Sequence, residues 1–67
     1  MSKMKIIDEL ADAQVPYIKE SLYDSVDWAM SGVDELNGLE GDNYNHCHNA
    51  IMIATIEKLM MDLDEKE

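Results

Sequence analysis

Residues 16–36, PYIKESLYDSVDWAMSGVDEL, carry the pattern that decides the fold. At about 100° per residue, the apolar side chains of this stretch gather on one face of a helix. That face consists of Ile18, Leu22, Ser25, Val26, Ala29, Val33 and Leu36. The opposite face carries an acidic stripe, formed by Glu20, Asp24, Asp27, Asp34 and Glu35. The segment therefore predicts one amphipathic helix, and Gly32 inside it favours a bend or an early end.

Helices are also predicted on both sides of this segment. Pro16 disfavours a helical conformation for the residue before it, so a first helix over residues 3–13 should end there and a second should begin at the proline. Asn37 and Gly38 favour a stop, and a third helix should run over residues 43–63 after a short loop, capped by Asp42 or Asn43. No alternating strand pattern is present, so the chain is expected to be all-α, a small helical hairpin or three-helix domain.

Size and composition limit how such a domain can be stabilised. The chain has 67 residues and one cysteine, so no internal disulfide is possible. The third segment is apolar on two sides: Met52, Ile56 and Leu63 mark one, and the other side is formed by Cys47, Ile51, Ala54 and Met61. A helix that is apolar nearly all round must be covered more than once. These four residues are the predicted interface of a homodimer, paired as a helical bundle.

Charge narrows the class of partner. The chain carries 15 acidic and 5 basic residues, a formal net charge of −10, which repels DNA, RNA and anionic membranes alike. The apolar fraction of 46% is too high for a disordered acidic tail. The longest apolar run, residues 50–56, is interrupted by Thr55, so we expect no membrane helix. The first residues carry two lysines but reach Asp8 and Glu9 before any run of seven apolar residues, so we expect no signal peptide and a cytoplasmic location.

The acidic stripe is the first candidate site. Glu20, Asp24 and Asp27 follow one another at four and three residues, roughly 4.5 to 6 Å apart along the axis, a spacing comparable to that of phosphates on a nucleic-acid strand. Tyr23 and Trp28 border the stripe, as large amphipathic rings border many binding hot spots. The stripe predicts binding to a basic, nucleic-acid-binding protein. A plain solvated helix face is the alternative interpretation.

The sequence gives little indication of a metal-binding or catalytic site. The run His46, Cys47, His48 contains metal-ligand types, but adjacent helix residues point about 100° apart and cannot converge on one ion. We expect polar caps and loop contacts for both histidines, and burial for Cys47, whose acidic surroundings oppose a nucleophilic thiolate. No phosphate-binding loop or hydrolase motif occurs. No catalytic residue, metal or cofactor is predicted, and the chain is not expected to be an enzyme.

The segment Asp24-Ser25-Val26-Asp27 resembles the Asp-Ser-Leu segment of acyl carrier proteins, a family of small acidic helical proteins. The resemblance covers about four residues. It implies that Ser25 would carry a phosphopantetheine group.

Three functions follow as hypotheses. The first is an inhibitor that mimics nucleic-acid phosphates, of the anti-restriction or anti-CRISPR kind carried by phages and mobile elements, which would act in the host cytoplasm. The second is a dimeric structural or regulatory adaptor, or an antitoxin-like module, that assembles through apolar surface. The third is a carrier protein modified at Ser25.

Overall fold

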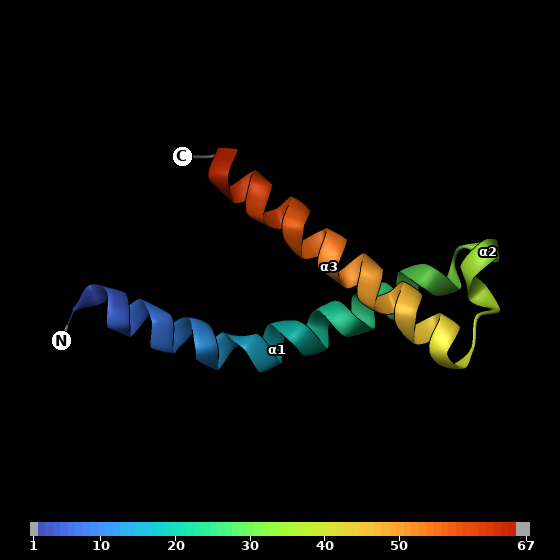
Figure 1. The fold of residues 1–67 in the computed structure, drawn as a ribbon, viewed down its shortest axis with the longest axis horizontal. Helices are drawn as coiled ribbons and strands as arrows, with labels where there is room; N and C mark the ends of the chain where they lie inside the picture. The colour runs from blue at the N-terminus through green and yellow to red at the C-terminus, as the bar shows by residue number, and fades with distance from the viewer. Residues whose placement is uncertain (1, 66–67) are drawn as a thin grey trace.

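The computed structural model describes residues 2–65, and these form an all-α hairpin. Helix α1 spans Lys3–Ser31, the short helix α2 spans Asp34–Asn37, and helix α3 spans Gly41–Glu65. Figure 1 shows α1 and α3 crossing at an angle, with α2 in the turn between them; the start of α1 and the end of α3 lie far apart on the side away from that turn. The predicted all-α fold is confirmed.

The predicted break at Pro16 is wrong, because α1 continues through the proline. Proline removes one N–H from the helix and favours an exit, but an exit also needs a turn. The neighbours Ala13, Gln14, Val15 and Tyr17 provide no glycine, serine or asparagine to make one. The helix bends near its middle instead (Figure 1), as proline-containing helices do. Ser2 caps its start by accepting a hydrogen bond from the Lys5 N–H at 3.3 Å.

The predicted second helix ends five residues early, at Ser31. Gly32 follows the helix, and its N–H donates to the Ala29 carbonyl at 3.2 Å. Val33 then adopts an extended conformation, with φ −113° and ψ 117°, and starts α2. The early end that Gly32 favoured is therefore confirmed, whereas α2 as a separate helix was not expected.

Helix α3 begins two residues before its predicted range and ends two residues after it. Gly41 begins it with φ +61°, a left-handed conformation that other residues adopt only at a cost. The helix therefore begins where glycine allows a positive φ. The prediction that Asp42 or Asn43 precedes the helix as its cap is wrong, because both residues lie within α3.

The core lies where α1 and α3 cross. Within residues 2–65 the buried side chains are Val26 and Met30 of α1 and His48 of α3. Every described residue before Leu22, and every one after Met52, is exposed. The two helices thus hold each other at one end only, and both arms extend beyond the contact without support.

Candidate functional site: an acidic helix face and an apolar groove

One side of α1 carries a carboxylate in its first third and three more in its second half. Because the helix does not break at Pro16, Glu9 shares a face with Glu20, Asp24 and Asp27. We call these four residues the α1 acidic face. They are all exposed, and at 1.5 Å per residue they span about 27 Å of the helix. The continuous helix therefore extends the predicted acidic surface toward the N-terminus.

The predicted acidic stripe does not lie on a single helix. Glu20, Asp24 and Asp27 belong to α1, whereas Asp34 and Glu35 belong to α2, beyond the break at Gly32. All five are exposed. The prediction placed them correctly on the surface, but the Gly32 and Val33 conformations interrupt the helix that was to align them.

A polar and aromatic cluster joins α1 to α3 at the crossing. The Tyr44 hydroxyl of α3 donates a hydrogen bond to the Asp27 carboxylate of α1. The His48 ring lies 4.0 Å from the Tyr23 ring and 5.5 Å from the Tyr44 ring, measured between centroids. The hydrogen bond to Asp27 raises the pKa of Tyr44 from 10.0 to about 12, with smaller contributions from burial and from the negative charge of Asp27. One carboxylate of the acidic face is thereby fixed in position.

His48 is a core residue, contrary to the expected loop contact. Its side chain is 1% exposed, and its Nε2 lies 2.9 Å from the Tyr23 carbonyl, to which it donates. Its Nδ1 is buried without a hydrogen-bond partner among the described residues. The sequence contained a signal for this position, since His48 lies four residues from both Tyr44 and Met52 on one helix face.

The other two residues of the His46-Cys47-His48 run lie apart from this core position. His46 is exposed and Cys47 is half-buried. Over residues 2–65 the structure holds no group of three or more His, Cys, Asp or Glu side chains placed to bind a metal ion.

The two aromatic rings that border the acidic surface differ in their surroundings. Trp28 is 81% exposed, so nearly all of its indole faces solvent. Tyr23 is 44% exposed and packs one side of its ring on His48. Trp28 is thus available to a partner, whereas Tyr23 is partly used by the fold.

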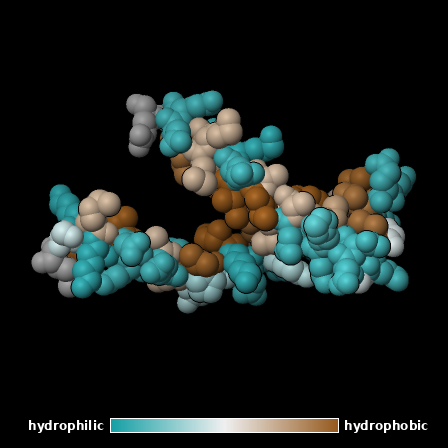
Figure 2. All heavy atoms as spheres, viewed as in Figure 1, coloured by the Kyte–Doolittle hydropathy of each residue, from teal (hydrophilic) through white to brown (hydrophobic). Residues whose placement is uncertain are grey.

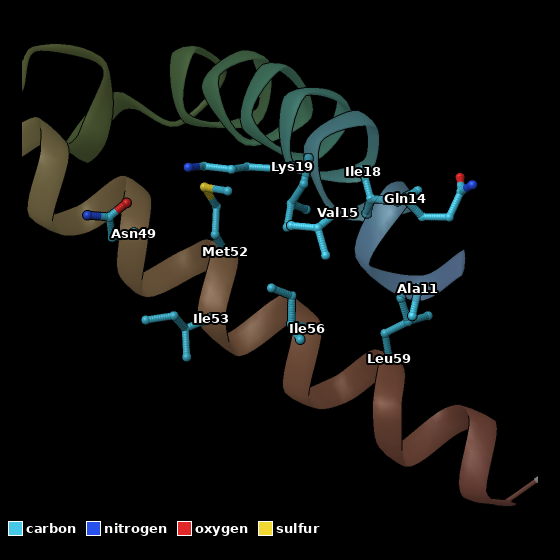
Figure 3. A pocket seen from close by; sticks show the side chains of 11 residues that line it. Ala11, Gln14, Val15, Ile18, Lys19, Asn49, Met52, Ile53, Ile56 and Leu59 are labelled. Atoms are coloured by element: carbon cyan, nitrogen blue, oxygen red, sulfur yellow. The ribbon is translucent and has the colours of Figure 1, made fainter. Parts of the chain in front are cut away.

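An apolar groove of about 690 Å³ lies in the angle between α1 and α3. Figure 3 shows its walls facing each other, and Figure 2 shows hydrophobic atoms gathered at this inner angle. The α1 wall consists of Ala11, Gln14, Val15, Ile18, Lys19 and Leu22, and the α3 wall of Asn49, Met52, Ile53, Ile56 and Leu59. The periodicity placed Ile18, Leu22, Met52 and Ile56 on apolar helix faces, but the angle between the helices that leaves these faces uncovered could not be predicted from it.

The predicted dimer interface lies on another side of α3. Cys47 and Ile51 are half-buried, and Ala54 and Met61 are exposed. None of these four lines the groove. Their role in a dimer stays a prediction, and the groove offers a second apolar surface on the same helix.

Ser25 lies in the middle of the α1 sequence with its side chain exposed to solvent, and its modification stays a prediction.

Neither long helix has a stretch apolar enough to cross a membrane within the part of the chain that the structure describes. Comparisons with protein-family models, with curated proteins and with solved structures found no match to this chain.

Proposed function

We propose that the chain is a non-enzymatic inhibitor that binds a basic, nucleic-acid-binding protein through the α1 acidic face. The observation that carries the proposal is the placement of exposed carboxylates along one continuous helix. Glu20 and Asp24 are four residues apart and Asp24 and Asp27 three, and like charges at such spacings repel each other by a few tenths of a kcal/mol per pair. A basic surface that normally holds phosphates would relieve this repulsion, so the face can compete with nucleic acid.

The distribution of lysines supports the same proposal. Helix α1 contains Lys3, Lys5 and Lys19, and of these Lys19 lines the groove. From Glu9 to Asp27 no other cation lies on the helix to compensate the carboxylates. Trp28, four residues after Asp24, adds an exposed ring beside the charged face, which suits a binding hot spot.

Charge reversal on this face tests the proposal. We expect immobilised protein to capture one or more nucleic-acid-binding proteins from a bacterial lysate at about 0.05 M salt and to release them near 0.5 M salt. Added DNA or RNA should compete with capture. The double variant Glu20→Lys, Asp24→Lys should lose capture while keeping its helical circular-dichroism spectrum.

The matched control reverses two carboxylates near the end of α3, Asp64→Lys and Glu65→Lys, and changes the net charge equally. It should retain capture. If both double variants capture equally well, or if nucleic acid does not compete, the acidic face is a solvated surface and the proposal is wrong.

A second candidate function, a helical assembly module, is favoured by the apolar groove. Such a module would recognise its partner through buried apolar area, and its binding would survive the Glu20→Lys, Asp24→Lys exchange. The two functions use different surfaces, so one chain can serve both.

A further inference from the structure

The two arms of the hairpin lack the packing that a stable small domain needs. Residues 3–21 of α1 and residues 53–65 of α3 are all exposed. An isolated helix as short as the α3 arm is marginal in water, and Pro16 interrupts the hydrogen bonding of the longer α1 arm. Several apolar side chains on these arms are more than half exposed to solvent, among them Val15 at 57%, Ile18 at 59% and Leu59 at 55%.

We infer that a second copy of this chain occupies the apolar groove, so that each copy covers the arms of the other. The inference rests on the second candidate function and is independent of the α1 acidic face. The same apolar faces that line the groove also form the arms. A two-fold pair, in which each arm enters the groove of the other copy, is therefore self-complementary.

The solvent-exposed area of the chain is large enough for a second copy to cover part of it. A compact monomer of this size would expose about 4,300 Å², whereas the chain exposes 5971 Å². The excess, roughly 1,700 Å² per chain, exceeds the ~800 Å² per partner of a standard interface and lies in the range of obligate homodimers. The radius of gyration of 15.3 Å is likewise larger than the value of about 11 Å expected for a compact domain of this length.

The charge of the groove also suits a second copy. Its lining contains no carboxylate and one charged side chain, Lys19. Two chains of formal charge −10 repel each other, and they can approach best through surfaces that carry no negative charge. A strongly basic partner would instead be drawn to the outer face of α1. The groove is therefore the side that an acidic chain of the same sequence can cover.

Sedimentation equilibrium of the full chain tests the inference, from about 1 µM to about 200 µM protein. We expect a reversible monomer–dimer equilibrium in the wild type. Ile56→Asp, which places a charge in the groove wall, should raise the dimer Kd by about tenfold or more. Ile56→Leu keeps the apolar volume and should leave the Kd within about threefold.

The comparison variant is Ala54→Asp, on the same helix but outside the groove. It should change the Kd less than Ile56→Asp. A wild-type chain that stays monomeric over the whole range overturns the inference. So does a dimer that Ile56→Asp leaves intact, or one that Ala54→Asp disrupts and Ile56→Asp does not. If the Glu20→Lys, Asp24→Lys variant loses lysate capture but keeps the wild-type dimer Kd, the α1 acidic face binds the captured protein and the groove separately holds the second copy.

Discussion

At the scale of single residues, the Tyr44–Asp27 hydrogen bond joins α3 to α1, and the ionisation of the Tyr44 phenol provides a way to measure it. The neutral phenol donates the bond, and ionisation would place two negative charges together. Its pKa is raised to about 12 in the fold, so the bond stabilises the fold below pH 10. This contribution is lost as the pH rises through about 12.

We therefore expect a tyrosinate absorbance titration to contain one component near pH 12 that disappears in Tyr44→Phe. Tyr17→Phe, which removes the hydroxyl of an exposed tyrosine on α1, should leave that component in place. A titration curve of Tyr44→Phe that retains the late component would show that Tyr44 does not hold this bond.

Gly41 and Gly38 offer a matched pair for the turn between α2 and α3. Neither position has an atom within 4 Å of an added Cβ, but only Gly41 has a positive φ, +61°. Gly41→Ala should therefore lower the free energy of unfolding by about 1 to 2 kcal/mol. Gly38→Ala, with φ −94°, should change it by less than about 0.5 kcal/mol. Urea denaturation measures both, and equal losses would contradict the conformational explanation.

At the scale of elements, the continuity of α1 through Pro16 determines how far the acidic face and the groove wall extend. In a continuous helix, proline removes the N–H that would donate to the Asp12 carbonyl. Pro16→Ala should restore it, raising the helical ellipticity and stabilising the chain by about 1 to 3 kcal/mol in urea denaturation. If a helix began at Pro16, the same substitution would replace a favoured first residue and destabilise slightly. The sign of the change distinguishes the two arrangements.

The same elements show what the sequence could predict. Apolar spacing identified helical segments, and Gly32 correctly marked an end, because both signals act through local backbone and side-chain physics. The helix break predicted at Pro16 was wrong, because a proline ends a helix only where neighbouring residues can form a turn. The groove could not be predicted, because it depends on the crossing of helices joined at one end. The burial of His48 depends on the same crossing, which brings Tyr23 and Tyr44 to its ring.

At the scale of the whole molecule, the hairpin measures 50 × 25 × 16 Å and buries only two apolar side chains, Val26 and Met30, among its described residues. The pairing of two copies that we infer above predicts that unfolding is coupled to dissociation of the dimer. The thermal midpoint should then rise with protein concentration, by mass action. Calorimetry at two concentrations tenfold apart checks this, and Ile56→Asp should lose most of the dependence. A wild-type midpoint independent of concentration would show that the hairpin is stable alone.

The salt response of self-association tests most directly whether this chain has an acidic outer face and an apolar inner one that pairs with itself. Salt screens the repulsion between two chains of formal charge −10 and leaves apolar burial intact. Sedimentation equilibrium at about 0.05 M and about 0.5 M sodium chloride should therefore show a tighter dimer at high salt. A chain that is monomeric at both concentrations, or a dimer that weakens as salt rises, would contradict the account.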